Sequence, residues 1–235
     1  MQILKHARVK PRVKKGAKKL KNKKEFERRS YNFEIRATDN ENGTKRLSGT
    51  PIVYDSPTDI GGMFQEVIDN GALDGANLKD VPLIVNHNTE MIPVARSRRN
   101  TPNSTMRLMV TSNGLDFEAD IDTERNATAL ELYSAVDRGD LDGMSFMFSV
   151  SGERWENLET EYPTRHITKL GVIAEVSAVT WPAYQATTIN ARSKEALDSA
   201  RSALENARQQ QAEPVDTGEL ELLKEKTKIL GGKTK

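Results

Sequence analysis

The sequence predicts a mainly β protein of the α+β class, with one globular domain between charged ends. Short runs of alternating apolar residues, separated by clusters of Gly, Pro, Asn and Asp, fill most of residues 31–180, which is typical of strands. Three segments show helical spacing instead. At 235 residues and 36% hydrophobic content, the chain has room for one substantial core plus tails.

Residues 1–30 form a basic head. They hold thirteen Lys and Arg against only Glu25 and Glu27, although the formal net charge of the whole chain is +1. Such a segment cannot bury enough apolar surface to offset the entropy of ordering it, so we predict disorder or a loose helix. It is either a solvated tail or a contact arm for an acidic partner or nucleic acid.

Five runs are predicted as the first strands of the domain. They are "YNFEIRAT" (31–38), "TPIVYDS" (50–56), "VPLIVNH" (81–87), "TMRLMVTS" (105–112) and "GLDFEADI" (114–121). The turn sequence "SNG" at 112–114 joins the last two, which predicts a hairpin.

A helix follows the hairpin. Its apolar residues recur at intervals of one turn: Ala129, Leu130, Leu132, Tyr133 and Val136. Thr123 is available as its N-terminal cap and Gly139 as its stop.

Strand texture returns after this helix. "LDGMSFMFSV" (141–150) and "GVIAEVSAVT" (171–180) are predicted strands, and the charged stretch 152–164 between them is predicted as irregular. Trp181-Pro182 ends the second strand because proline cannot continue a β-ladder.

The C-terminal part is predicted as a charged helical tail. Residues 193–211 carry a thin apolar stripe of Leu197, Ala200, Leu204 and Ala207, and residues 219–230 are predicted as a second short helix. We therefore divide the chain into the head 1–30, a domain 31–192 and a tail 193–235.

Composition excludes several kinds of chemistry. The chain has no cysteine, so disulfides, thiolate metal sites and a cysteine nucleophile are impossible. No apolar run approaches the roughly 20 residues of a membrane span, and no secretory signal follows the basic head, which favours a soluble intracellular protein. "VDTG" (215–218) spells an aspartic-protease motif without its flanking strands, and no histidine shows metal-site spacing, so neither a metal nor a cofactor is predicted.

Ser145 stands out in "LDGMSFMFSV" because alternation separates it from the apolar residues. Met144, Phe146 and Phe148 share one strand face, which must be core, and Ser145 lies on the other. It is either an ordinary serine on a solvated face or a nucleophile, and a nucleophilic serine needs a base beside it.

Histidine is the suitable base, and only His87 and His166 lie in the predicted domain. His87 ends an apolar strand, where it is either a packed or surface residue or the base. Glu175 interrupts an otherwise apolar strand, and an ionised carboxylate there needs a partner. It is either a salt-bridged or edge residue or the group that orients the imidazole, a role for which His166 is the alternative.

Taken together, "FEIRATD", "GTPIVYDSPTDIGGMFQEVIDNGAL", "VPLIVNHN", "ELYSAVDRGDLDGMSFMFSV" and "RHITKLGVIAEVSAVTWPAYQATTINAR" resemble the prohead maturation proteases of tailed bacteriophages, over about residues 33–192. That family is similar in fold to the herpesvirus assembly proteases. The resemblance implies an antiparallel β-barrel-like core of that type.

The resemblance also implies residue roles: Ser145 as nucleophile, His87 as general base and acid, and Glu175 as the group that orients His87, with His166 as alternative. The sequence does not identify the backbone N–H groups that receive the oxyanion; Gly143 and the turn around Arg165 are candidates. The sequence departs from the family pattern at Met147, Ala95 and Leu73, where glycine, glycine and phenylalanine are usual. None of these departures removes a catalytic group.

The implied function is a serine endopeptidase that cleaves the scaffold segment of the major capsid protein, and itself, inside the assembling procapsid in the host cytoplasm. Its implied partners are the capsid protein and further copies of itself, with no membrane and no cofactor. The rivals are a non-catalytic assembly module of the same fold, and a nucleic-acid-binding protein that acts through the basic head.

Overall fold

A computed structural model describes residues 26–31, 35–40, 43–180 and 191–212 of the chain. Its strands are β1 Glu27–Tyr31, β2 Ile35–Asp39, β3 Lys45–Val53, β4 Thr58–Ile60, β5 Phe64–Ile68, β6 Asp80–Val85, β7 Ala95–Arg98, β8 Met106–Thr111, β9 Gly114–Ile121, β10 Gly143–Glu156 and β11 Thr164–Val179. The helices are α1 Ala127–Asp137 and α2 Ala191–Ala212. The predicted mainly β, α+β class is confirmed.

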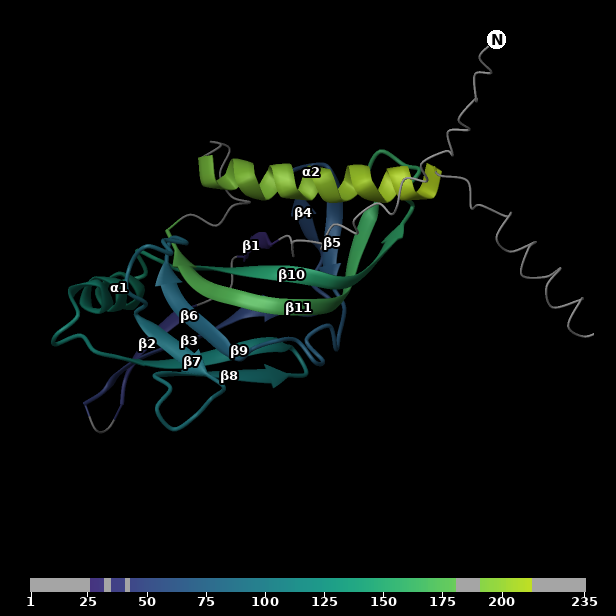
Figure 1. The fold of residues 1–235 in the computed structure, drawn as a ribbon. Coiled ribbons are helices and arrows are strands. Elements are labelled where there is room, and N and C mark those ends of the chain that lie inside the picture. Colours follow the sequence, from purple (N-terminus) through teal and green to yellow (C-terminus); the bar gives the residue numbers. More distant parts are fainter. Residues whose placement is uncertain (1–25, 32–34, 41–42, 181–190, 213–235) are drawn as a thin grey trace, which may run out of the picture.

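The strands form two sheets (Figure 1). The larger one has seven strands in the order β1-β10-β11-β5-β4, and β6 pairs with β11 and with β7. The smaller one has four antiparallel strands in the order β2-β3-β9-β8. These sheets are not closed into a barrel, so the barrel-like core is not confirmed.

Two long strands, β10 and β11, lie next to each other in the middle of the larger sheet. They pair antiparallel from Gly143↔Val179 at one end to Glu156↔Thr164 at the other. Of the charged stretch 152–164 predicted as irregular, residues 152–156 belong to β10 and Thr164 to β11, whereas residues 157–163 connect the two strands. β11 also pairs in parallel with β5 near its start and with β6 near its end, so the sheet is mixed.

The core lies between the two sheets. Phe117 and Leu47 from the smaller sheet and Phe146 and Phe148 from β10 belong to one cluster of fully buried apolar side chains. The predicted hairpin is confirmed as β8 and β9. A Cβ at Gly114, where β9 begins, would lie 1.9 Å from the carbonyl oxygen of Ile52, so only glycine fits there.

Helix α1 begins later than the sequence predicted. Its cap is Asn126, whose side chain accepts the N–H of Ala129, and not Thr123. Gly139, with φ +75°, follows the last turn as predicted.

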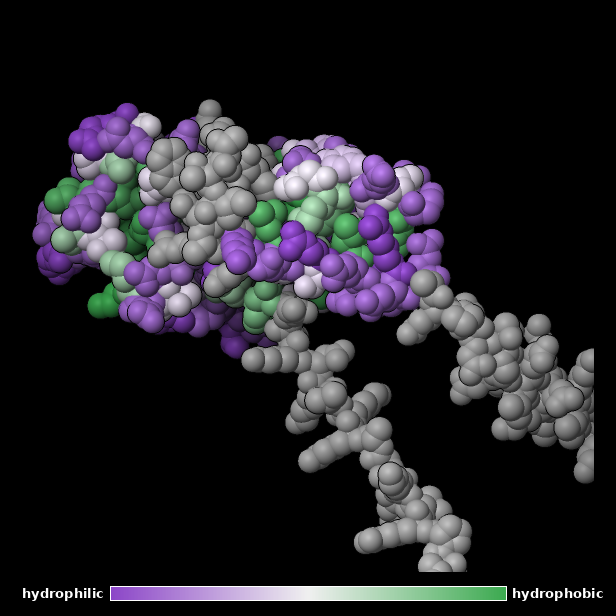
Figure 2. All heavy atoms as spheres, turned by 90° about the horizontal axis from the view of Figure 1, so that it is seen from above, coloured by the Kyte–Doolittle hydropathy of each residue, from purple (hydrophilic) through white to green (hydrophobic). Residues whose placement is uncertain are grey.

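Helix α2 confirms the first predicted helix of the tail. It covers β4 and β5 (Figure 1), where Ala200 and Leu204 pack against Ile60, Phe64 and Leu158 in a second apolar cluster. Hydrophilic residues prevail over the outward side of this region in the view from above (Figure 2). The predicted helix at 219–230 and most of the basic head lie outside the described residues, and residues 27–30 of the head form part of β1.

Candidate active site

Ser145 is the third residue of β10 and lies on the face that the alternation predicted. Met144, Phe146 and Phe148 point into the core, whereas Ser145 and Met147 lie on the opposite face. That face is not solvated at this point, because Ser145 has an exposed fraction of 0%. A buried hydroxyl needs hydrogen-bond partners, and Ser145 has them.

Three buried serines lie in one row across neighbouring strands. Ser30 of β1 pairs with Ser145 of β10, which pairs with Ser177 of β11. The Ser145 hydroxyl donates to the carbonyl oxygen of Arg29 at 2.8 Å and accepts from the Ser30 hydroxyl at 2.9 Å. Neither Ser30 nor Ser177 was identified from the sequence, because only strand pairing brings them to Ser145.

His87 lies two residues beyond the end of β6, in a turn that folds onto β11. Asn86 and His87 both have left-handed backbone conformations, with φ of +51° and +56°. The backbone N–H of His87 donates to the Ser177 hydroxyl at 2.9 Å. Ser177 is the direct neighbour of Ser145 across the β10–β11 pair. This hydrogen bond therefore holds the turn that contains His87 next to the row of serines.

Glu175 holds the His87 ring. Its Oε1 lies 2.6 Å from Nδ1 of His87, and the two side chains are 3% and 9% exposed. A carboxylate only accepts hydrogen bonds, so a carboxylate at this position suits the tautomer in which Nδ1 carries the ring proton and Nε2 has a free electron pair. This is the tautomer that a general base requires.

The second oxygen of Glu175 is also buried, and it has no hydrogen-bond partner within the part of the chain that the structure describes. Met147, opposite Glu175 on β10, shares this face. Among the hydrogen bonds of the described residues, none joins Ser145 to His87, so the serine and the histidine–glutamate pair are neighbours that are not yet coupled.

His166 lies elsewhere. It belongs to the start of β11, where its Nδ1 is 2.7 Å from Asp69 and 2.9 Å from a guanidinium nitrogen of Arg154. The contact to the His87 ring comes from Glu175, at the other end of the strand. Of the two alternatives for the orienting group, the structure brings only Glu175 to His87.

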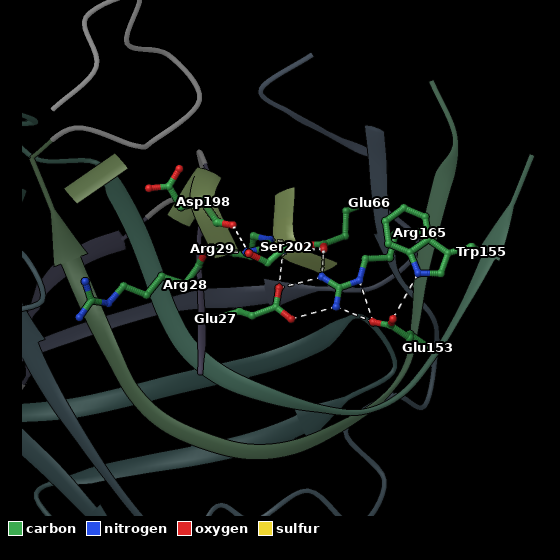
Figure 3. Close-up of polar contacts among 9 residues, drawn as sticks. All are labelled: Glu27, Arg28, Arg29, Glu66, Glu153, Trp155, Arg165, Asp198 and Ser202. Carbon is green, nitrogen blue, oxygen red and sulfur yellow. Dashed lines mark hydrogen bonds and ion pairs between the residues drawn. The ribbon is translucent and has the colours of Figure 1, made fainter. Parts of the chain in front are cut away.

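The expected turn around Arg165 is also absent, because Arg165 lies within β11. Its side chain belongs to an ionic cluster in which Glu27, Arg29, Glu66 and Arg165 are buried and Glu153 is exposed (Figure 3). Arg29 binds Glu66 at 2.5 and 2.8 Å, and Arg165 binds Glu27 at 2.7 and 2.8 Å. Gly143, the other expected oxyanion residue, opens β10 two positions before Ser145.

The electrostatics of the ionic cluster favour its charged forms. Burial alone would raise the pKa of Glu27, but Arg29 and Arg165 outweigh it and hold that pKa at about 2. Burial likewise opposes the charge of Arg165, whose pKa is nevertheless raised by Glu27 and Glu66. Both buried arginines of the ionic cluster, Arg29 and Arg165, are thus paired with carboxylates.

No group of three or more acidic or histidine side chains suited to a metal ion occurs within the described ranges. The described helices include none that is long and apolar enough to cross a membrane. The "VDTG" motif at 215–218 lies outside the described residues.

A buried serine, a histidine and a carboxylate brought to one end of a sheet are the elements of a serine hydrolase site. Comparison with protein families points the same way, since the family model of caudovirus prohead serine proteases matches residues 31–201. The chain belongs to this family, and it is a serine peptidase of phage capsid maturation. No curated protein and no solved structure matches it.

Proposed function

We propose that this protein is the endopeptidase that cleaves the scaffold segment of the major capsid protein inside the assembling procapsid in the host cytoplasm, and that it also cleaves itself. Ser145 is the nucleophile, His87 the general base and acid, and Glu175 the group that orients the imidazole. The observation that carries this proposal is the 2.6 Å contact between His87 Nδ1 and Glu175 Oε1. This contact lies beside the row of serines that includes Ser145.

The proposed reaction uses these three residues. His87 Nε2 takes the proton of the Ser145 hydroxyl as Oγ attacks a peptide carbonyl carbon, and the same proton then goes to the departing amine. The peptide C–N bond breaks and an ester to Ser145 remains. Water, deprotonated by His87, hydrolyses that ester and releases the acid product. Glu175 stabilises the imidazolium that forms in each half of the reaction.

The hydroxyl must turn before it can react. In the structure it donates to the Arg29 carbonyl, which supports a resting state in which nucleophile and base are uncoupled. Rotation about the Cα–Cβ bond of Ser145 would break that bond and present the proton to His87. A protease confined with its substrate during assembly benefits from such a state, since premature cleavage would remove the scaffold.

The proposed targets within this chain are the segments outside the central domain, namely the basic head 1–30 and the tail 193–235. As an alternative role, we propose that the head or the tail docks the protease on the scaffold. We assign nucleic-acid contact by the head only a secondary role.

The test is co-expression with the cognate capsid protein, followed by intact mass of both chains. We compare the wild type with Ser145→Ala and with Ser149→Ala, which removes a buried hydroxyl from the same strand. We expect truncated capsid protein and protease with the wild type and Ser149→Ala only. Uncleaved masses in shells that had assembled and packaged the wild-type protein would favour the non-catalytic assembly module instead.

A further inference from the structure

The turn that carries His87 has an unfavourable backbone. Two consecutive residues other than glycine, Asn86 and His87, have φ near +50°. Left-handed conformations are uncommon for such residues, and they persist where surrounding contacts determine them. The contacts that hold this turn therefore decide where the imidazole lies.

Several hydrogen bonds anchor these two residues to the end of β11 and to Thr180, which follows it. The N–H of Asn86 donates to the carbonyl of Ala178 at 2.8 Å, and the Asn86 side-chain oxygen accepts the N–H of Thr180 at 3.1 Å. The N–H of His87 donates to the Ser177 hydroxyl at 2.9 Å. Of these acceptors, only the Ser177 hydroxyl contacts His87 itself.

Ser177 is well placed to act as a fixed acceptor. It is fully buried, and its hydroxyl donates in turn to the Ile84 carbonyl at 3.3 Å, which leaves its electron pairs for His87. It also lies directly opposite Ser145 across the β10–β11 pair. One residue thus fixes the base relative to the strand position that carries the nucleophile.

We infer that Ser177 is a positioning residue for His87. Glu175 sets the rotation of the ring through Nδ1, and Ser177 sets the position of the backbone from which the ring projects. Both side chains come from one strand and are two residues apart, so they share a face and act on His87 together. This inference rests on the proposed function, because it concerns the geometry of the reaction.

The chain provides a matched control in Ser149. This serine is also buried in the larger sheet, and its hydroxyl also accepts a backbone N–H, from Val172 at 3.1 Å. It has no contact with His87 or Glu175 among the described residues. Ser177→Ala and Ser149→Ala therefore remove the same kind of hydrogen bond, one at the histidine turn and one away from it.

The experiment measures cleavage of the capsid protein by the wild type, Ser177→Ala, Ser149→Ala and Ser177→Thr. A displacement of the base of about 1 Å lowers a rate by on the order of a hundredfold. We expect kcat to fall roughly 10- to 100-fold in Ser177→Ala with KM within about twofold. Ser149→Ala retains kcat, and Ser177→Thr, which keeps the hydroxyl, regains most of the rate.

A second measurement does not depend on cleavage. In a Ser145→Ala background, amide hydrogen exchange of the His87 N–H is followed by NMR with and without Ser177→Ala. We expect faster exchange at His87, and no such change with Ser149→Ala. Unchanged exchange, or equal losses of kcat in the two alanine variants, would overturn the inference. A wild type that cleaves nothing would instead overturn the proposed function.

Discussion

The larger sheet contains two buried polar groups that differ in how completely they are paired. In the ionic cluster, every carboxylate is bound to a guanidinium, and Glu27 and Glu66 each bind both Arg29 and Arg165 (Figure 3). In the candidate active site, one oxygen of Glu175 contacts His87, and the other is buried without a hydrogen-bond partner among the described residues. The backbone at His87 is also left-handed, whereas Arg29 and Arg165 lie in regular strands.

This difference teaches how to separate structural from functional polar groups. Unsatisfied polar atoms and unfavourable backbone conformations cost free energy, and they persist where function requires them. The ionic cluster ties β1 to β5, β10 and β11 and needs no other explanation. The candidate active site retains a cost that its contacts do not offset, which is expected of groups held ready for chemistry.

The sharpest test of the comparison is Glu175→Gln. The amide keeps an acceptor for His87 but not the charge that stabilises the imidazolium, so we expect kcat to fall by about 10³- to 10⁴-fold. Because the substitution removes a buried charge with an unpartnered oxygen, we expect the free energy of unfolding to be unchanged or higher. Denaturant unfolding and cleavage assays measure the two effects. An intact rate together with a large loss of stability would make Glu175 structural.

Glu66→Gln is expected to have the opposite effect. It leaves two buried arginines with too few carboxylates, which costs on the order of 3–5 kcal/mol of unfolding free energy. Thermal unfolding would then shift down by roughly 10 °C. We expect the folded fraction to retain kcat, because the Glu66 side chain has no hydrogen bond to Ser145, His87 or Glu175 among the described residues.

Glu118→Gln is the matched control for that substitution. Glu118 pairs with Arg46 at the surface at 3.4 Å and is 43% exposed, so its loss should cost less than about 1 kcal/mol. Equal stability losses in the two variants would show that burial does not distinguish the ionic cluster.

The ionic cluster should also make the free energy of unfolding sensitive to acid. The pKa of Glu27 is held at about 2, below its ordinary value, so its contribution is fully present above about pH 4.5 and is lost as pH falls towards 2. That contribution is on the order of 3 kcal/mol. Glu27→Gln should therefore be less stable than the wild type at pH 7 and should show a shallower loss of unfolding free energy between pH 4.5 and 2. Parallel curves would contradict this assignment.

The sequence could predict the candidate site better than the ionic cluster. Ser145, His87 and Glu175 are polar residues at the ends or in the middle of apolar runs, so each breaks a visible pattern. Glu27, Arg29 and Glu153 lie in charged stretches that are typical of solvated segments, and Glu66 in "FQEVI" was not singled out. β1 was missed for this reason, since "ERRSY" shows no apolar alternation and its burial depends on partners far along the chain.

The row of serines could not be predicted from the sequence either. Ser30 and Ser145 are 115 positions apart, and only the pairing of β1 with β10 brings their hydroxyls together. The cap of α1 was predicted wrongly for a local reason: Asp122 and Arg125 form a turn, in which the Arg125 N–H donates to Asp122, and this delays the helix until after Asn126.

His166→Gln should have the smallest effect and would settle which group orients His87. His166 binds Asp69 and Arg154 near the start of β11. Arg154 is about half exposed, so these contacts of His166 contribute little to the free energy of unfolding. We expect a change in unfolding free energy below about 1 kcal/mol and a cleavage rate within about twofold of the wild type. His87→Gln, the control at the other histidine, should abolish cleavage. If His166→Gln were inactive while Glu175→Gln retained its rate, the orienting role would pass to His166, and the contact of Glu175 with His87 would be structural.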